Sequence, residues 1–382
     1  MKILTNIKFV QTAGIAQALF SFLDFVEEGK RGDIQVVGIN IVNKEKESYR
    51  KRSKKRTAII SIGLKVPPIS KTIQGILRLQ DIENRYSKVI EGFQRAIREE
   101  RPDLVLINGT YYLPWCLLLA AQREKASVVL HYHGVLTKEV RGYGAKQREI
   151  FREMEKCFDS KDIFYIFPSF LAKRVVEKEV FGHTISKCKV LPNSVPLYFH
   201  GPMTDNASNK IGVVSRYARI KNLDFVYKLA EYNQNHGGKF EINLITDISP
   251  KKSPLHKWAK IINVQKPVNN KALPAFYQKM GLILSPSHFE TYGNVAKEAL
   301  AAGTPAMVSK NMGVSETFKK LGLRKLVISF DSVKSVYEKI EKEIGQEIEE
   351  NVRNKIKKLY SPSNIFSKMI RELERANCSR AI

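Results

Sequence analysis

The chain has 382 residues, of which 43% are hydrophobic and 27% are charged, and its formal net charge at pH 7 is +26. This composition excludes disordered, collagen-like and disulfide-rich proteins, and the length suits two domains better than one. A positive field of this size favours polyanionic partners such as nucleic acid, anionic lipid or phosphorylated substrates.

The cysteines and residues 1–14 indicate the cellular compartment in which the protein is expected. The four cysteines form no CxxC pair and no Cys–His spacing typical of zinc sites; they are Cys116, Cys157, Cys188 and Cys378. A chain of this size without a cysteine framework is typical of a reducing compartment, so we expect a cytoplasmic protein. Residues 1–14 lack the long apolar core of a signal peptide and are expected to form a buried first strand.

Residues 104–122 contain no charged side chain and are nearly long enough to span a membrane. Asn108 and Gly109 followed by Pro114 interrupt this segment, and Asn and Gly are costly in the middle of a bilayer. The segment therefore predicts a strand, a turn and a helix of a soluble or peripheral protein.

Short β-rich runs alternate with amphipathic helical stretches along the chain. In the first half, the predicted strands are residues 3–5, 34–41, 58–64, 104–107, 128–131 and 164–166. Helical periodicity extends over residues 82–99 and 147–158. In the second half, the predicted strands are residues 211–214, 240–245, 261–264, 282–284, 306–308 and 326–328. This alternation predicts two doubly wound parallel sheets, with ligand sites at the carboxyl ends of their strands.

A polar segment at residues 202–210 (PMTDNASNK) separates the two halves. We therefore predict a first Rossmann-like domain over residues 1–200 and a second over residues 201–361. A Ser-Pro-Ser break precedes a final amphipathic helix, which we assign to residues 362–382.

Residues 44–56 (KEKESYRKRSKKR) concentrate the positive charge. Three interpretations stay open from the sequence: a solvated loop between strands, a patch that binds an anionic membrane surface, and a nucleic-acid contact. The segment has a single aromatic residue, Tyr49, and lies in no nucleic-acid-binding motif, so we expect no nucleic-acid partner.

Residues 285–309 (SPSHFETYGNVAKEALAAGTPAMVS) carry the most informative pattern. They begin where a predicted strand ends and open a helix near Tyr292 and Gly293, whose first N–H groups suit a phosphate. Glu290 precedes this helix and Glu298 lies in its second turn. Because a carboxylate accepts hydrogen bonds from vicinal hydroxyls, one Glu suits a sugar and the other a ribose of the same ligand.

This stretch resembles the Glu-x7-Glu signature of the large retaining glycosyltransferase family with two Rossmann-like domains (GT-B fold), often called family 4 or glycosyl transferases group 1. Further motifs resemble that family in the same order along the chain: Arg101-Pro102-Asp103, His131-Tyr132-His133-Gly134, Val190-Leu191-Pro192-Asn193-Ser194-Val195, Ser215-Arg216-Tyr217 with Lys221-Asn222, and Gly313-Val314-Ser315-Glu316. The resemblance covers most of the chain and is strongest over residues 190–318.

The resemblance implies roles for individual residues. Arg216 and Lys221 would bind the donor diphosphate and stabilise the charge that develops on the leaving group. Glu290 would contact the donor sugar, and Glu298 the nucleotide ribose. His133 would contact the sugar from the first domain, although a strand-capping role is its alternative.

The remaining donor contacts implied by the resemblance are the backbone of Thr291, Tyr292, Gly293 and Asn294 and the glycine loop at Gly14. His131, His256, His288 and Asn193 are expected to be structural. Three positions depart from the family pattern: Ala13 stands for the first glycine of the Gly-Gly pair, Thr246-Asp247-Ile248 for a G-x-G, and Lys297 for a small or apolar residue.

The sequence therefore predicts a retaining hexosyltransferase with two Rossmann-like domains facing across a cleft, the C-terminal helix crossing back to the first domain. It contains no Asp-x-Asp motif to hold a metal, so we expect metal-independent transfer from a UDP- or GDP-linked sugar. The expected acceptor is a glycan or a lipid-linked molecule, in polysaccharide or glycolipid assembly at the inner face of a membrane. The alternatives are a sugar-nucleotide epimerase of the same fold and a non-catalytic basic protein that binds polyanions or membranes.

Overall fold

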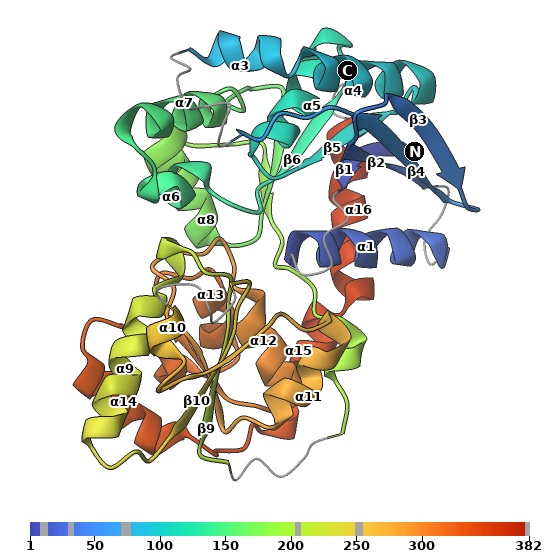
Figure 1. Cartoon of the computed structure of the whole chain (residues 1–382). Helices are drawn as coiled ribbons and strands as arrows, with labels where there is room; N and C mark the ends of the chain where they lie inside the picture. The colour runs from blue at the N-terminus through green and yellow to red at the C-terminus, as the bar shows by residue number, and fades with distance from the viewer. Residues whose placement is uncertain (8–13, 30–33, 70–77, 203–207, 249–254, 379–382) are drawn as a thin grey trace. The chain divides into compact units, whose positions relative to one another are not determined.

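The computed structural model in Figure 1 describes residues 1–7, 14–29, 34–69, 78–202, 208–248 and 255–378. The chain divides into two compact units, Met1–Pro192 with Ile365–Ile382, and Asn193–Asn364. The sequence placed this boundary near residue 200, whereas the units divide after Pro192. Asn193 and Val195 belong to the second unit because Asn193 Nδ2 donates to Asn294 Oδ1 at 2.9 Å and Val195 N to Tyr360 O at 2.8 Å.

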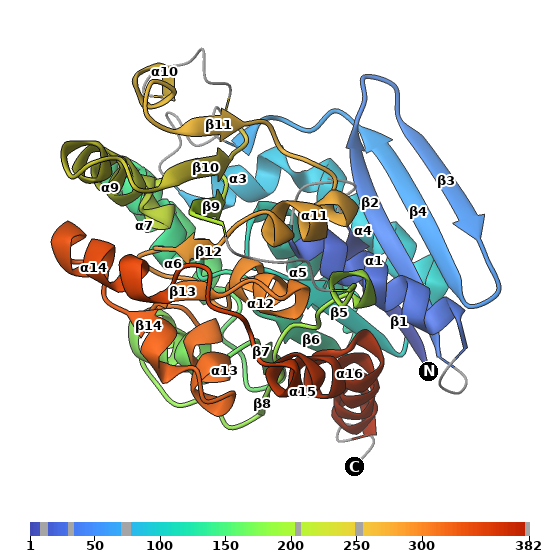
Figure 2. The same ribbon diagram turned by 90° about the horizontal axis from the view of Figure 1, so that it is seen from below.

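The first unit contains an eight-stranded sheet in the order β3-β4-β2-β1-β5-β6-β7-β8. Every pairing is parallel except that of β3 with β4. The strands are β1 (Lys2–Ile7), β2 (Gln35–Asn43), β3 (Ser48–Ser53), β4 (Thr57–Leu64), β5 (Leu104–Asn108), β6 (Val128–His131), β7 (Phe164–Phe167) and β8 (Cys188–Val190). Figure 2 shows β3, β4 and β2 side by side at one end of this sheet.

Helices cover both faces of the first sheet, because right-handed crossovers that run in opposite directions place their helices on opposite faces. They are α1 (Gly14–Glu27), α3 (Leu79–Arg85), α4 (Ser87–Glu100), α5 (Tyr112–Arg123), α6 (Leu136–Glu139), α7 (Ala145–Lys156), α8 (Phe170–Val175), a π-helical turn at Val176–Phe181, and α16 (Pro362–Cys378). The segment at residues 104–122 is a strand, a turn and a helix, as predicted. No helix in the described part of the chain is long and apolar enough to cross a membrane.

The C-terminal helix α16 packs on the first unit. The ring centroid of Phe366 lies 5.4 Å from that of Phe22 and 5.7 Å from that of Phe25, both on α1. Ile365, Met369 and further apolar residues of α16 are buried. The predicted return of the C-terminal helix to the first domain is therefore confirmed.

The second unit contains a six-stranded parallel sheet in the order β11-β10-β9-β12-β13-β14, visible in that order in Figure 2. The strands are β9 (Lys210–Val214), β10 (Glu241–Ile245), β11 (Asn263–Gln265), β12 (Leu282–Ser285), β13 (Ala306–Ser309) and β14 (Val327–Ile328). The helices are α9 (Leu223–Asn235), α10 (Leu255–Trp258), α11 (Leu273–Gln278), α12 (Asn294–Ala302), α13 (Val314–Lys320), α14 (Val333–Glu343) and α15 (Glu350–Tyr360). The predicted fold class, two doubly wound α/β domains, is confirmed.

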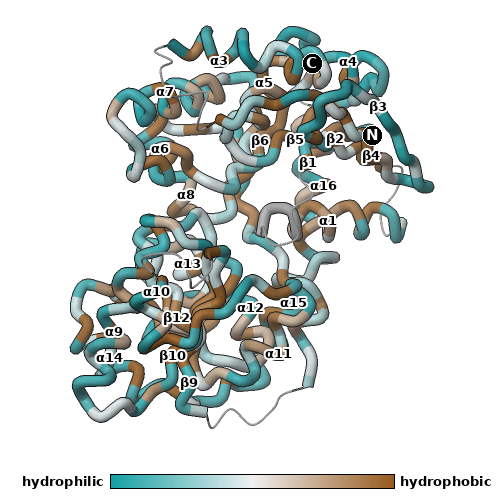
Figure 3. The backbone as a smooth tube through the Cα atoms, viewed as in Figure 1, coloured by the Kyte–Doolittle hydropathy of each residue, from teal (hydrophilic) through white to brown (hydrophobic). Residues whose placement is uncertain are grey.

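The cores of both units are the central strands. All five residues of β5 and all four residues of β12 and of β13 are buried, as expected for parallel strands covered on both faces. In Figure 3 the brown, hydrophobic segments follow these central strands, whereas β3 is teal.

The basic segment at residues 44–56 is not a loop, as one interpretation held, but contains the edge strand β3. It pairs antiparallel with β4 from Ser48↔Gly63 to Ser53↔Ala58. Two of its side chains contact α4: Lys51 Nζ pairs with Glu100 at 2.5 Å, and the Tyr49 ring lies 4.1 Å beneath the guanidinium of Arg95. Lys and Arg along an edge strand oppose pairing with another chain, which accounts for charge in a strand that lacks an apolar alternation.

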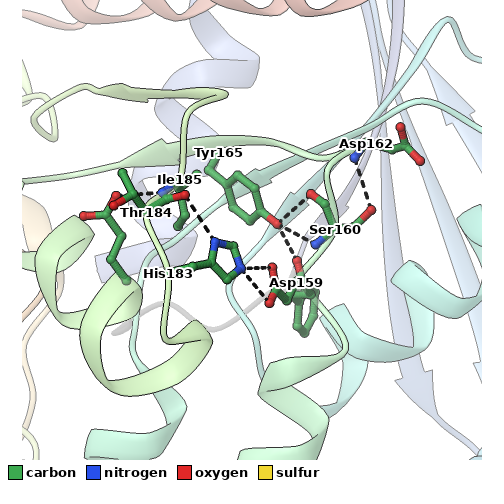
Figure 4. A network of polar contacts seen from close by, with 9 residues as sticks. Asp159, Ser160, Asp162, Tyr165, His183, Thr184 and Ile185 are labelled. Atoms are coloured by element: carbon green, nitrogen blue, oxygen red, sulfur yellow. Dashed lines mark hydrogen bonds and ion pairs between the residues drawn. The ribbon is translucent and has the colours of Figure 1, made fainter.

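An ion pair joins two loops at the amino ends of β7 and β8 (Figure 4). The Nε2 atom of His183 lies 2.9 Å from both carboxylate oxygens of Asp159, and Nδ1 lies 3.2 Å from the carbonyl oxygen of Thr184. Because both ring nitrogens face oxygen acceptors, the doubly protonated ring satisfies both contacts. The hydrogen bond that His183 donates to the Asp159 carboxylate raises the pKa of His183 above its usual value.

This pair predicts a stability difference that depends on pH. The folded pKa of His183 lies above the unfolded value of about 6.5, so its stabilising contribution is complete below that pH and declines as the pH rises through the folded pKa. We expect His183→Ala to lower the melting temperature more at about pH 6 than at about pH 9. Asp159→Asn is the matched control and should remove the pH-dependent part. A His183→Ala difference that is the same at both pH values would contradict the assignment.

Candidate functional site

The carboxyl ends of β9 and β12 form the topological switch point of the second sheet, where open α/β sheets bind ligands. The loop after β9 carries Arg216, which is exposed, and a 3-10 turn at Arg219–Lys221. The loop after β12 carries Glu290. The sheet topology therefore places three predicted site residues at one edge of the sheet.

Backbone contacts hold these two loops together. His288 N donates to Ile220 O at 2.9 Å, and Asn222 Nδ2 donates to Pro286 O at 3.2 Å. Asn222 has a φ of +55°, a conformation that Asn adopts more readily than most residues, and it directly precedes α9 as its N-cap. This turn directs Lys221 toward the loop after β12.

Lys221 and Glu290 form an ion pair at this edge. Lys221 Nζ lies 3.0 Å from Glu290 Oε1, and the two side chains are 17% and 22% exposed, respectively. Ser287 Oγ donates to the same carboxylate oxygen at 2.6 Å. A cation and a carboxylate are thus fixed side by side and remain accessible to a ligand.

The backbone of Glu290 is fixed against the loop after β13. Glu290 N donates to Asn311 O at 3.3 Å, and Gly313 N donates to Glu290 O at 3.0 Å. Two residues further on, Val314 N donates to Tyr292 O at 2.7 Å. Backbone hydrogen bonds therefore fix the loop that precedes α12 at two positions, Glu290 and Tyr292.

Gly293 is required where α12 begins. Its φ is +104°, and a Cβ atom there would lie 2.4 Å from Cε of Met312 and 3.3 Å from Cγ1 of Val314. Gly293 occupies the N-cap position of α12 and has no side chain with which to cap the helix. Because the first N–H groups of a helix have no partner within the helix, Asn294 and the residues after it present donors suited to an anion.

The other predicted residues of this segment lie as follows. Thr291 and Tyr292 are buried, and the Tyr292 hydroxyl bonds to Thr317 Oγ1 at 2.9 Å. The side chain of Tyr292 is therefore used inside the domain, and the backbone contact of Tyr292 with a donor stays a prediction. Asn294 Oδ1 accepts the hydrogen bond from Asn193 described above.

Glu298 is half-buried on α12, and Tyr277 donates its hydroxyl to Oε2 at 3.3 Å. Burial raises the pKa of Glu298 to about 7, against the opposing effects of the Tyr277 hydroxyl and of Lys297. Its carboxyl group is therefore close to half-ionised at neutral pH in the ligand-free protein.

His133 and Gly14 lie in the first unit. Gly14 begins α1, after the end of β1. His133 follows β6 and lies with its ring centroid 3.8 Å from that of His131. Its Nε2 atom lies 3.2 Å from Asn108 Oδ1. Burial lowers the pKa of His133 to about 4, so the ring is neutral at pH 7 and acts as a hydrogen-bonding group.

The sequence gives no sign of two buried polar residues in this region: Asn108 contacts His133 directly, and Glu155 binds the chain before and after it, at Tyr132 and Leu136. Asn108, at the carboxyl end of β5, donates Nδ2 to Thr5 Oγ1 at 2.7 Å, which orients its oxygen toward the imidazole. Glu155 is completely buried on α7 and accepts hydrogen bonds from Leu136 N at 2.8 Å and from the Tyr132 hydroxyl at 2.9 Å. The Asn-Gly-Thr motif at residues 108–110 predicts only a turn, and a buried Glu on an amphipathic helix gives no signal in the sequence.

Among the residues that the structure describes, no group of three or more His, Cys, Asp or Glu side chains is arranged to hold a metal ion. The charged groups that converge at the switch point of the second sheet are Lys221 and Glu290.

Residues 202–359 match the model of the glycosyl transferases group 1 family. The matched region lies within the second unit, which therefore resembles the glycosyl transferases group 1 family. The predicted group 1 resemblance is therefore confirmed, and the site residues lie within the matched region, apart from His133 and Gly14. A comparison with curated proteins found no match.

Solved structures confirm the GT-B fold over the whole chain. A sucrose-phosphate synthase from Thermosynechococcus elongatus is 13% identical with a TM-score of 0.76, over 99% of this chain and 100% of that one. An alpha,alpha-trehalose-phosphate synthase (UDP-forming) from Burkholderia xenovorans, in complex with glucose-6-phosphate, is 12% identical with a TM-score of 0.69, over 98% and 99% of the two chains. A trehalose-6-phosphate structure from E. coli bound with UDP-2-fluoro glucose is 12% identical with a TM-score of 0.65, over 100% and 98%.

Proposed function

We propose that this protein is a retaining glycosyltransferase that moves a hexose from a UDP- or GDP-linked sugar to an acceptor without a metal ion. The observation that carries the proposal is the Lys221–Glu290 ion pair beside the start of α12, at the switch point of the unit that matches the group 1 model. The E. coli relative of the same fold is bound with UDP-2-fluoro glucose, which supports a UDP-linked donor.

The proposed reaction breaks the bond between the anomeric carbon and the diphosphate oxygen, and forms a bond from that carbon to an acceptor oxygen. The negative charge that develops on the diphosphate is stabilised by the helix start at Gly293 and Asn294 and by Lys221 and Arg216. Glu290 is proposed to orient Lys221 and to accept a hydrogen bond from the donor sugar. The retained stereochemistry comes from the family resemblance.

The proposed roles of the remaining residues follow the sequence analysis. Glu298 accepts hydrogen bonds from the ribose, and Thr291 and Tyr292 contribute backbone contacts. In the first unit, His133 and Gly14 remain the proposed contacts to sugar and phosphate.

The acceptor is proposed to be a glycan or a lipid-linked molecule of cell-surface polysaccharide or glycolipid assembly, used at the inner face of a membrane. The strongly positive chain suits an acceptor that carries phosphate. The Burkholderia relative is in complex with glucose-6-phosphate, so a sugar phosphate belongs in the acceptor assay as well.

Sedimentation with anionic vesicles tests the proposed membrane contact. A variant with residues 51–56 neutralised should lose binding to the vesicles, and a wild-type chain that does not sediment with them would contradict the membrane contact.

The decisive experiment is a thermal-shift screen of the purified protein against UDP-, GDP- and ADP-sugars in the presence of EDTA. A ligand that binds the folded state raises the melting temperature according to its concentration relative to Kd. We expect one nucleotide sugar to stabilise the protein, and Arg216→Ala and Glu298→Ala to lose that shift. No shift with any donor would reject the proposal and favour the basic polyanion-binding alternative. Transfer of the hexose to an acceptor, with stoichiometric release of nucleoside diphosphate, distinguishes the transferase from the epimerase.

The raised pKa of Glu298 predicts that donor binding depends on pH. Its carboxyl group must be ionised to accept hydrogen bonds from both ribose hydroxyls, and its pKa in the free protein is about 7. We expect the affinity for the nucleotide sugar to fall as the pH decreases through 7, by about tenfold per pH unit well below that value. The diphosphate of a nucleotide sugar is esterified at both ends and does not titrate in this range.

The control for this prediction is Glu298→Gln, which cannot ionise. Its affinity should be lower than that of the wild type at alkaline pH and independent of pH. Isothermal titration calorimetry at several pH values measures both proteins. A wild-type affinity that is constant between about pH 5.5 and 8.5 would reject the ribose role of the ionised carboxylate.

A further inference from the structure

Lys297 is a completely buried lysine on α12, directly before Glu298. Its Nζ donates to the Tyr292 hydroxyl at 2.8 Å and to the backbone carbonyl of Asn193. The ring centroids of Tyr292 and Tyr360 lie 4.4 Å and 4.5 Å from the same nitrogen. The ammonium group thus has two oxygen acceptors and two aromatic faces around it.

Such a site is costly for a charged group. Burial lowers the pKa of Lys297 well below its usual value, and the charge of Glu298 opposes this shift. Two hydrogen bonds and two ring faces offset part of the cost of removing an ammonium group from water. Replacing a buried charge with an apolar side chain of similar volume is often neutral or stabilising, so stability alone does not explain the presence of a lysine here.

The groups around Lys297 come from three segments of the second unit. Asn193 lies at the beginning of the unit, Tyr292 in the loop before α12, and Tyr360 at the end of α15. The Asn193 side chain also donates to Asn294, the first residue of α12. The lysine therefore fixes the helix start from two directions, through Tyr292 before it and through Asn193 beside it.

The backbone hydrogen bonds of the loop do not by themselves fix the direction in which α12 begins. Tyr292 O accepts from Val314 N, which fixes one side of the peptide chain, and the next residue, Gly293, has the positive φ that turns the chain into α12. A rotation at Gly293 would redirect the first N–H groups of the helix. The side chain of Tyr292, held by Lys297 and Thr317, opposes that rotation.

We propose that Lys297 is a positioning residue of the donor site, whose buried ammonium group holds Tyr292 and Asn193 so that the start of α12 faces the donor diphosphate. This inference rests on the proposed function. Lys297 does not touch the ligand: it acts on donor binding by fixing Tyr292 and the start of α12, and it has no direct role in the reaction. This role accounts for a lysine at position 297, where the family pattern has a small or apolar residue.

The test compares Lys297→Met with the wild type. Methionine keeps the length of the side chain and removes the charge and both hydrogen bonds. We expect the affinity for the stabilising nucleotide sugar to fall about tenfold, in keeping with the loss of hydrogen bonds to a charged group. The melting temperature of the ligand-free variant should not fall in parallel, and the donor KM should rise more than kcat falls. Lys342→Met on the exposed side of α14 controls for the change in net charge.

Tyr292→Phe provides a second test that keeps the ring and removes the hydroxyl. We expect weaker donor binding from this variant, and a loss in the double variant with Lys297→Met that is smaller than the sum of the two single losses, because the two changes share the Lys297–Tyr292 contact. If Lys297→Met does not fold, the affinity of Tyr292→Phe decides: a wild-type affinity overturns the inference.

The inference and the proposed function fail in different ways. A wild-type protein that binds a nucleotide sugar, together with a Lys297→Met variant that binds it equally well, overturns the inference alone. A wild-type protein that binds none of the donors overturns the proposed function, and the inference with it.

Discussion

Replacing Glu290 by glutamine is expected to lower kcat by about 10²- to 10³-fold, the range seen when one preorganised electrostatic contact is removed from an active site. The carboxylate holds Lys221 at 3.0 Å and accepts the hydroxyl of Ser287 at 2.6 Å. Glutamine retains the shape of the side chain but not its charge, so Lys221 loses the partner that orients it. Because the backbone contacts of residue 290 do not depend on its side chain, the variant should fold normally.

The measurement is the release of nucleoside diphosphate from the donor identified by the thermal-shift screen, with a panel of acceptors. Glu338→Gln, an exposed position on α14, is the matched control and should retain wild-type activity. A Glu290→Gln variant whose rate stays within about threefold of the wild type would remove Glu290 from the proposed site.

Replacing Lys221 by methionine is expected to reduce both donor affinity and kcat. The change removes a cation from the proposed diphosphate site and leaves the carboxylate of Glu290, which is 22% exposed, without its partner. We expect a loss of about 10²-fold in kcat and about tenfold in donor affinity, because the cation is proposed to contact both the bound donor and the leaving group.

The double variant Lys221→Met/Glu290→Gln distinguishes a joint role from two separate ones. If the residues act as a pair, the double variant should be little worse than the more damaging single variant. Effects that multiply would show that the two side chains act independently. Lys228→Met, an exposed position on α9, controls for the loss of one positive charge and should have wild-type kinetics.

The candidate site shows which of its parts follow from sequence and which do not. Glu290 and Gly293 were predicted because they are close together between a strand and a helix, and local spacing determines their placement. Lys221 was predicted from its own loop after β9. Its 3.0 Å contact with Glu290 depends on the adjacency of β9 and β12, which are separated along the chain by β10 and β11.

Lys297 and Glu155 illustrate the opposite case. Each is a charged residue on an amphipathic helix, and charged residues on helices are usually exposed. Burial on all sides comes from segments distant in sequence, such as Asn193 and Tyr360 around Lys297. The sequence showed that Lys297 was unusual but not what it contacts.

The sequence by itself determined the alternation of strands and helices, the two-domain α/β class and the segment that carries the proposed donor contacts, because hydrophobic periodicity and turn residues act over a few positions. The tertiary structure decided the strand character of residues 48–53, the division between the units after Pro192, and the partners of Lys221, His133 and Lys297. These features depend on contacts between residues far apart in the chain. Strand pairing at an edge, and the burial of a charge in a cage of distant groups, are set by packing and leave no periodic pattern in the sequence.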